Sequence, residues 1–282
     1  MLRNIAVAAL LAAVAPVASA SDAEHSSATD TTIPGGVIGA EPSNWSIGIA
    51  LGYGVRSNPL IQSEDIPILV DLDIAWFGER FFFDNGDVGL TFSDNDWFTL
   101  NFIARFNSDR VFFGKTNTRI VQVDFGAGNI VDIEVRVPDR DYAIEAGAEL
   151  LTGGDWGRLQ LTAFRDISAT HGGYELGADY SYGIRQQRWY IEPSVGISMK
   201  SRKLNDYYWG IRADEMSLAL AGYHADSGIN VSLRVLGSYQ LTTKWAVAIV
   251  AEYEQLNNEA AESPIVRDDH VVGFFAGFGY RF

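Results

Sequence analysis

The sequence predicts an all-β fold, a transmembrane antiparallel β-barrel of about 12 strands with both termini periplasmic. Three observations support this prediction. Segments in which apolar and polar residues alternate recur from Trp45 to the C-terminus, no apolar run after residue 20 is long enough for a membrane helix, and most tryptophans fall at one end of the predicted strands. Because lipid cannot satisfy backbone hydrogen bonds, only helices and closed barrels span it, so if this chain lies in a membrane it must cross as strands.

The N-terminal residues predict export. One positive charge at Arg3 precedes the apolar run Ile5–Val17, and the small residues Ala18, Ser19 and Ala20 follow it. This pattern is typical of a secretory signal peptide covering residues 1–20. A single membrane anchor is the alternative, but a helix needs roughly 20 apolar residues to cross a bilayer.

Two further regions follow the signal peptide. Residues 21–43 are polar and contain Pro34-Gly35-Gly36, a composition that favours a flexible periplasmic segment. Residues 44–282 form the predicted barrel. Removal of residues 1–20 takes away one basic residue and no acidic one, which leaves 20 basic and 36 acidic side chains and a net charge of −16.

That charge and the absence of cysteine exclude several classes of function. A strongly acidic protein is a poor partner for nucleic acid. Without cysteine the chain has no disulfide framework, no thiolate metal site and no lipidated cysteine.

The alternation is clearest in the first strand, where Trp45, Ile47, Ile49, Leu51 and Tyr53 alternate with small residues. A period of two indicates a strand with unlike faces. The other predicted strands cover residues 66–76, 98–106, 142–150, 159–163, 174–182, 189–197, 231–235, 245–253 and 272–282, with weaker ones near 80–83 and 87–92. Tilted membrane strands need about 9 to 11 residues, and an even strand number places both termini on one side.

Short and long connections alternate along the chain. The long segments are 54–65, 107–141, 166–172, 199–229 and 255–270. Short periplasmic turns and long external loops are typical of outer-membrane barrels. The link Asp84–Gly86 is short where a long loop is expected, so it breaks this rule.

The tryptophans provide a separate test, because indole rings prefer the membrane–water interface. All but one fall at the predicted periplasmic ends of strands, whereas Trp209 lies in a predicted external loop. A soluble sandwich or lipocalin-like fold also alternates, but it has no reason to gather tryptophans at one level. The predicted periplasmic aromatic girdle comprises Trp45, Trp76, Trp97, Trp156, Trp189 and Trp245.

The polar rows of the strands face the predicted interior. If the lumen is open, the excess of acidic residues favours cations. Alternatively, these groups pair with each other and fill the interior, as in small barrels. The lumen-lining candidates are Asp71, Asp73, Arg105, Glu145, Glu149, Arg158, Glu175, Asp179, Glu192, Arg234, Glu252 and Arg281.

The histidines offer little evidence for chemistry. His171 is close in sequence to Asp166 and Ser168, and His270 follows Asp268-Asp269. Catalysis needs a nucleophile, a base and an orienting group within hydrogen-bond reach, and polar residues near a loop histidine are common. Acidic loops could hold calcium weakly, but a solvated surface is the simpler interpretation. We therefore expect no catalytic residue, no metal site and no cofactor.

The C-terminus resembles known outer-membrane proteins. Residues Gly277–Phe282 close on a terminal phenylalanine, and in such proteins the last strand addresses the assembly machinery, here through Tyr280 and Phe282. Together with Gly52-Tyr53-Gly54, Phe81-Phe82-Phe83, Tyr207-Tyr208-Trp209-Gly210, Ser238-Tyr239, Lys244-Trp245 and Ser263-Pro264-Ile265-Val266, these residues resemble the MipA/OmpV family of MltA-interacting proteins. The likeness covers nearly the whole mature chain, although the segment Thr116–Asp141 matches no family motif.

The resemblance implies a location in the outer membrane of a Gram-negative bacterium. It also implies a scaffold that links a lytic murein transglycosylase to a murein-synthesising penicillin-binding protein; other members of the family resemble porins or adhesins. Two hypotheses therefore stay open, the murein-enzyme scaffold and a small-solute, porin-like channel with mild cation selectivity. Neither requires an enzymatic activity.

Overall fold

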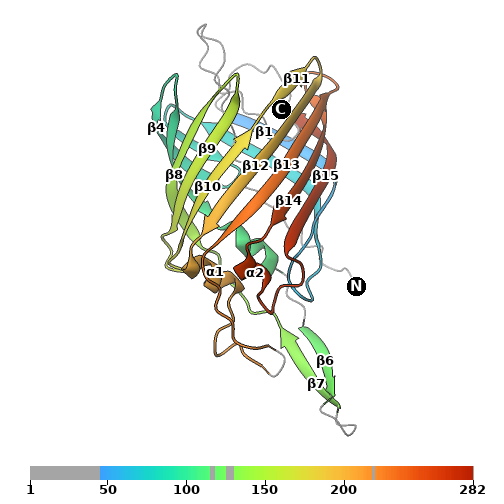
Figure 1. Cartoon of the computed structure of the whole chain (residues 1–282). Helices are drawn as coiled ribbons and strands as arrows, with labels where there is room; N and C mark the ends of the chain where they lie inside the picture. The colour runs from blue at the N-terminus through green and yellow to red at the C-terminus, as the bar shows by residue number, and fades with distance from the viewer. Residues whose placement is uncertain (1–44, 115–117, 125–129, 218–219, 282) are drawn as a thin grey trace.

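The computed structural model describes residues 45–114, 118–124, 130–217 and 220–281. The predicted signal peptide, the segment 21–43 and Phe282 lie outside the described residues. Thirteen antiparallel strands form one sheet that curves into a barrel, and two further strands form a separate hairpin (Figure 1). The large sheet contains β1 (Trp45–Arg56), β2 (Ile66–Phe77), β3 (Phe81–Asp84), β4 (Asp87–Asp94), β5 (Thr99–Phe106), β8 (Ile144–Gly154), β9 (Gly157–Asp166), β10 (Tyr174–Ser181), β11 (Ile184–Gln186), β12 (Trp189–Lys200), β13 (Gly228–Gln240), β14 (Trp245–Gln255) and β15 (His270–Arg281).

Hydrogen bonding between β10 and β12 closes the sheet on itself. β10 and β11 pair with successive parts of β12, so they occupy one position in the ring. The ring therefore has twelve positions, in agreement with the predicted strand number.

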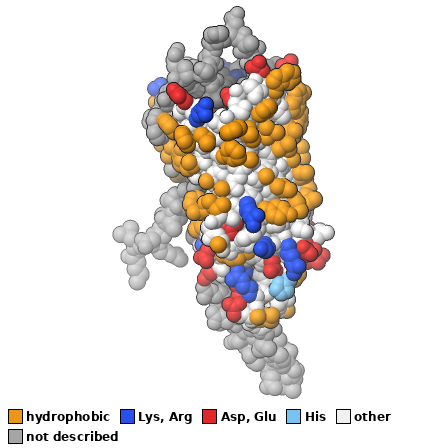
Figure 2. Space-filling view, turned by 90° about the vertical axis from the view of Figure 1, so that its left-hand side faces the viewer, with side chains coloured by type: hydrophobic (Ala, Val, Ile, Leu, Met, Phe, Trp, Pro, Cys, Tyr) orange, Lys and Arg blue, Asp and Glu red, His pale blue; other side chains and the backbone are white. Residues whose placement is uncertain are grey.

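The alternation in the sequence explains why these strands curve around a polar interior. Along β8, Ile144 is exposed, whereas Glu145 is fully buried and Glu149 nearly so. On β15, Phe274 and Phe278 are exposed on the outer face. Figure 2 shows the result on one face of the barrel, where hydrophobic side chains cover the outer surface.

The short link at Asp84–Gly86 is confirmed. Asn85 and Gly86 have φ values of 47° and 104°, the backbone conformation of an Asn-Gly hairpin turn. This turn makes β3 only four residues long, and β3 pairs with β2 only at residues 75–77. Within the described part of the chain, β2 residues 66–73 thus have a strand partner on the β1 side alone.

The segment 107–141, predicted as a long connection, has secondary structure of its own. It contains the 3-10 helix η1 (Ser108–Phe113) and a hairpin of β6 (Thr118–Asp124) and β7 (Ile130–Arg136). Within the described residues, the strands of this hairpin pair with each other and not with the large sheet. The hairpin extends beyond the barrel (Figure 1). Two helices, α1 (Arg202–Trp209) and α2 (Asn258–Ala261), likewise form within predicted loops. None of the described helices has the length and apolar character required to cross a membrane.

The two ends of the barrel differ. We call the end with the short links β2–β3, β4–β5, β8–β9, β11–β12 and β13–β14 the turn rim, and the opposite end, with α1, α2 and η1, the loop end. Trp45 pairs with Trp76, and Tyr280 pairs with Trp245. The first described strand therefore starts at the turn rim, and the last one ends there.

Candidate functional site: the barrel interior and the closed loop end

Arg105 lies inside the barrel toward the loop end, one residue before the end of β5. Its Nη2 lies 3.0 Å from Glu145 Oε2 and 3.3 Å from Glu175 Oε1, and its guanidinium stacks over Phe164. β5 and β10 are separated in the wall by β8 and β9, so the contact with Glu175 crosses the inside of the barrel. An arginine with two carboxylate partners holds distant strands together through charge-assisted hydrogen bonds.

Glu149 lies further along the same inner row of β8. It accepts hydrogen bonds from Asn101 Nδ2 at 2.9 Å and from Gln160 Nε2 at 2.5 Å. Buried polar groups are tolerated when they are hydrogen-bonded, and here neutral amides rather than a cation provide the donors.

Two more ion pairs extend this network toward the turn rim and along the wall. Arg158 Nη2 lies 3.5 Å from Glu192 Oε2, which also accepts a hydrogen bond from the Tyr190 hydroxyl. Arg234 pairs with Glu252 at 3.0 Å. The described interior arginines are therefore neutralised by neighbouring carboxylates.

Nine of the twelve lumen-lining candidates have described side chains, and eight of these nine form the contacts given above. The ninth, Asp179, lies beside Gly196, where a Cβ would meet its carboxylate. Asp71 and Asp73 lie on β2 and Arg281 ends β15, but their side chains are outside the described part. The amides of Asn101 and Gln160 are not among the candidates, although the alternation places Asn101 on the same polar face as Arg105.

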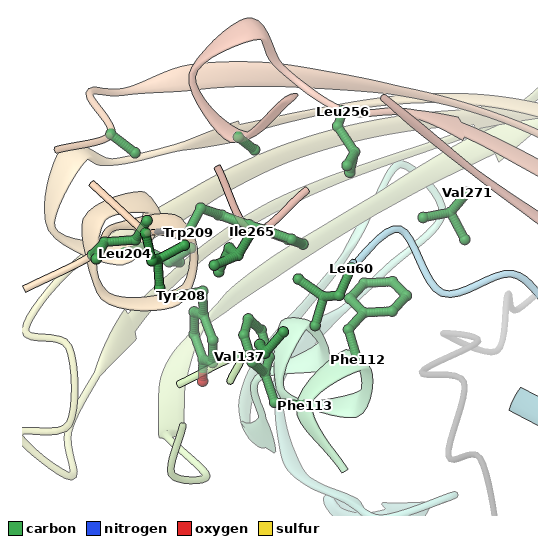
Figure 3. Packing of buried hydrophobic residues seen from close by; sticks show 14 residues of the cluster. Leu60, Phe112, Phe113, Val137, Leu204, Tyr208, Trp209, Leu256, Ile265 and Val271 are labelled. Carbon is green, nitrogen blue, oxygen red and sulfur yellow. The ribbon is translucent and has the colours of Figure 1, made fainter. Parts of the chain in front are cut away.

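The loop end is closed by a buried apolar cluster, which we call the loop plug (Figure 3). It draws on four of the five long segments, namely those following β1, β5, β12 and β14. Trp209 is 1% exposed and contacts the rings of Phe112 and Phe113 at centroid distances of 6.1 and 5.9 Å. The members are Leu60, Phe112, Phe113, Val137, Leu204, Tyr208, Trp209, Ile211, Leu220, Ala225, Leu256, Ala260, Ile265 and Val271.

A buried arginine, Arg140, links two of the long segments beside the loop plug. Arg140 has a fully buried side chain that contacts Glu215 at 2.6 and 3.2 Å and donates to the carbonyl of Gly210 at 2.7 Å. Burial acts to raise the pKa of Glu215, but hydrogen bonds from Arg140 and from the Arg212 backbone outweigh it, so the pKa is lowered. The carboxylate form therefore favours the closed arrangement.

A second buried pair joins the plug to the barrel wall. Lys200, at the end of β12, contacts Asp109 of η1 at 2.6 Å, and both side chains are almost fully buried. Burial raises the pKa of Asp109 even though Lys200 opposes this shift. The pair anchors η1 inside the ring of loops.

The loop histidine does not form a catalytic arrangement with its neighbours. Asp166 accepts hydrogen bonds from Ser168 and from the backbone of His171 and Gly172. His171 Nδ1 accepts from the Gly173 backbone, and its Nε2 faces Glu145 at 3.3 Å. Within the described residues, the contacts of His171 stabilise the loop, and the Ser168 hydroxyl bonds to Asp166 and Thr170 and not to the imidazole.

His270 and the acidic residues before it form local surface contacts. His270, the first residue of β15, is half-buried, contacts the exposed Asp269 at 2.8 Å and stacks on Tyr253. The described residues contain no cluster of three His, Cys, Asp or Glu side chains arranged to hold a metal ion.

The turn rim carries exposed aromatic side chains. Trp97, Trp156, Trp189 and Trp245 are 82%, 51%, 56% and 45% exposed, and Trp76 is half-buried. Trp189 packs on Tyr239, and Trp245 packs on Tyr280, at centroid distances of 4.6 and 4.8 Å. The side chain of Trp45 is outside the described part. Trp209, expected in an exposed loop, is instead part of the loop plug.

Comparison with protein families gives a match to the family described as MltA-interacting protein MipA over residues 47–282. The chain belongs to the MipA family. It is 23% identical over 255 residues to outer membrane protein Omp26La of Vibrio anguillarum, covering 90% of this chain and 93% of that protein. It is 24% identical to OmpV of Vibrio cholerae, covering 85% and 87% of the two chains. It is also 25% identical to the MltA-interacting protein of Escherichia coli over 56% of this chain and 64% of that protein.

Two solved barrels are also similar to this MipA-family chain. The translocator domain of autotransporter NalP from Neisseria meningitidis gives a TM-score of 0.43 at 11% identity, covering 86% of this chain and 90% of that domain. OmpT of Vibrio cholerae gives 0.36 at 8% identity, covering 87% and 99%. The homologues named above agree with the expected location in the outer membrane of a Gram-negative bacterium. Their names denote membrane and interaction proteins and no catalytic activity.

Proposed function

We propose that this MipA-family protein is a non-conducting outer-membrane scaffold that binds murein enzymes in the periplasm. The observation that carries the proposal is the loop plug, in which side chains from four long segments close one end of the barrel. A pore for small solutes needs a continuous polar path, whereas this end is filled by packed aromatic and aliphatic side chains. The interior ion pairs fill the space behind the plug.

The proposed orientation places the turn rim in the periplasm and the loop end outside the cell. It rests on the rule that outer-membrane barrels have short periplasmic turns and long external loops. Both described chain ends then lie on the periplasmic side, next to the segment 21–43. The exposed tryptophans of the rim act as the interfacial girdle, and Tyr280 with Phe282 serves as the assembly signal.

The partners are inferred from the family. The relatives in Escherichia coli and Shigella flexneri are named MltA-interacting protein, and the resemblance implies a lytic murein transglycosylase and a penicillin-binding protein. We propose that the turn rim and the preceding segment bind such enzymes. No enzymatic activity of the barrel itself is required.

The channel remains the second candidate, supported by the amide-bound carboxylate of Glu149 in the interior. Planar-bilayer recording with purified full-length protein separates the two functions. We expect silent bilayers together with retention of a lytic murein transglycosylase on the immobilised protein. Stepwise, cation-selective conductance that falls in a Glu149→Gln variant would instead establish a channel.

A further inference from the structure

Four basic side chains surround the loop 166–173 at the loop end. We call Arg110, Arg165, Arg202 and Lys203 the basic collar. Arg165 is exposed on β9 and pairs in register with Tyr174, while Arg202 and Lys203 are exposed in the first turn of α1. Lys203 Cδ is 3.9 Å from the position that a Cβ would take at Gly172, and Arg110 lies 4.6 Å over the ring of Tyr142.

The charges of the basic collar have no partners among the described residues. None of its members forms one of the ion pairs that hold the interior arginines. The Nε and Nη1 atoms of Arg110 are shielded and have no hydrogen-bond partner there. These atoms are not accessible from outside, so Arg110 contributes its positive charge to the collar while its guanidinium stays over the ring of Tyr142.

The N-terminus of α1 adds to the positive electrostatic potential of the basic collar. Arg202 and Lys203 stand in the first turn of α1, which contains no acidic residue. The amino end of a helix carries a partial positive charge, so cations are unfavourable there and a bound anion is favourable. In a chain with a formal net charge of −15, this local concentration of positive charge needs a compensating ligand.

Apolar side chains adjoin the basic collar on the outer surface. Tyr142 and Ile167 are 61% and 63% exposed, and Ile144 and Tyr174 about two fifths. In the space-filling view, Lys and Arg side chains, with Asp and Glu side chains among them, lie beside the hydrophobic surface toward the loop end (Figure 2). A ligand that contacts both the basic collar and these apolar side chains must have anionic groups next to acyl chains.

We propose that the basic collar binds the phosphate groups of an outer-leaflet glycolipid of the lipid A type, whose acyl chains lie along the neighbouring apolar strands. The proposal rests on the orientation given under the proposed function, because phosphorylated glycolipid occupies the outer leaflet. Arginine and lysine pair well with phosphate, and the planar guanidinium can contact two oxygens at once.

The test uses the full-length protein in detergent micelles and native mass spectrometry. Protein is incubated with bisphosphorylated lipid A or with dephosphorylated lipid A. Micelles have no sidedness, so this experiment tests the site independently of membrane orientation and conductance. The variant replaces Arg165, Arg202 and Lys203 by Gln; the matched control replaces Arg80, Arg188 and Lys244, exposed at the turn rim, by Gln.

We expect the wild type and the control to retain bisphosphorylated lipid A in preference to the dephosphorylated form. Each basic residue near an anionic surface contributes about fivefold in affinity, so the collar variant should lose on the order of a hundredfold. Equal retention of both lipids, or retention by the collar variant equal to that of the control, would overturn the proposal. Displacement by millimolar inorganic phosphate, or equal binding of phosphatidylglycerol, would do so as well, because each removes the requirement for a phosphorylated glycolipid.

Discussion

Tryptophan has opposite surroundings at the two ends of this barrel. At the turn rim Trp97 is 82% exposed, whereas at the loop end Trp209 is 1% exposed and packs against Phe112 and Phe113. An indole at the rim stabilises the position of the protein in the membrane interface. The indole of Trp209 stabilises the packing between the loops. Closure of the loop end and the position of the barrel in the membrane therefore depend on different tryptophans.

The largest expected effect comes from removing the buried indole. Trp209→Ala should destabilise the loop plug by about 3–5 kcal/mol, since truncation of a large buried side chain leaves a cavity. We expect faster proteolysis of the loops and stepwise conductance in a bilayer where the wild type is silent. Heat-modifiable gel mobility checks that the barrel is intact, and Trp97→Ala is the matched control. Loops as resistant as those of the wild type would show that Trp209 does not hold the plug closed.

Removal of the buried arginine should have the next largest effect. Arg140→Leu leaves Glu215 without its main partner, and breaking a buried ion pair costs about 3 kcal/mol. Hydrogen exchange in the segment 199–217 should accelerate accordingly. Arg267→Gln, which removes a half-exposed pair with Asp268, should change exchange by less than about 1 kcal/mol. Equal effects of the two variants would contradict the role of Arg140.

Acid should loosen the loop end, with a smaller effect than Arg140→Leu. The pKa of Glu215 is lowered from its ordinary value of 4.5 in the folded protein, so its contribution to stability is complete above that value. The contribution is lost as the pH falls through the lowered pKa. Loop protection in hydrogen exchange, followed from pH 7 to pH 3, should therefore decrease in the wild type. Glu215→Gln should remove this part of the pH dependence; an unchanged profile would exclude Glu215 as its source.

The smallest effect is expected at the turn rim. Trp189→Phe keeps an aromatic ring beside Tyr239 and should alter the free energy of unfolding by less than about 1 kcal/mol. Urea unfolding in lipid bicelles measures this change. Brominated lipids should quench the fluorescence of a single-tryptophan variant that retains Trp189 but not of one that retains Trp209. Quenching of both would contradict the comparison of the two ends.

The strands of the barrel wall could be predicted because the alternation within each strand shows which side chains lie on which of its two faces. Glu145 and Ile144 show this, since neighbours in the chain point to opposite sides. Most of the tight links were also predictable from local residues, including the Asn85-Gly86 turn. The resemblance to the MipA family and the outer-membrane location followed from short motifs and from their order along the chain.

The loop plug could not be predicted in this way. Its members come from segments separated by up to about two hundred residues. The residues of one loop do not indicate which other loops it contacts. Trp209 was therefore expected at the surface although it is buried. The pairing of Arg140 with Glu215 likewise depends on two loops 75 residues apart. The charged lumen candidates could be named because they alternate visibly with apolar residues, whereas Gln160 was not named because its neighbours are less distinctive.

The short β3 strand has a consequence for the integrity of the wall. Alternate residues of the β2 stretch 66–73 direct their amide and carbonyl groups away from β1, toward a side with no described strand. Hydrocarbon offers these groups no hydrogen bonds, so the ladder is thinnest along this line. Thermal rupture of the cylinder should start at this seam, and the part of the wall in which β12, β13, β14 and β15 pair along most of their length should be the last to separate.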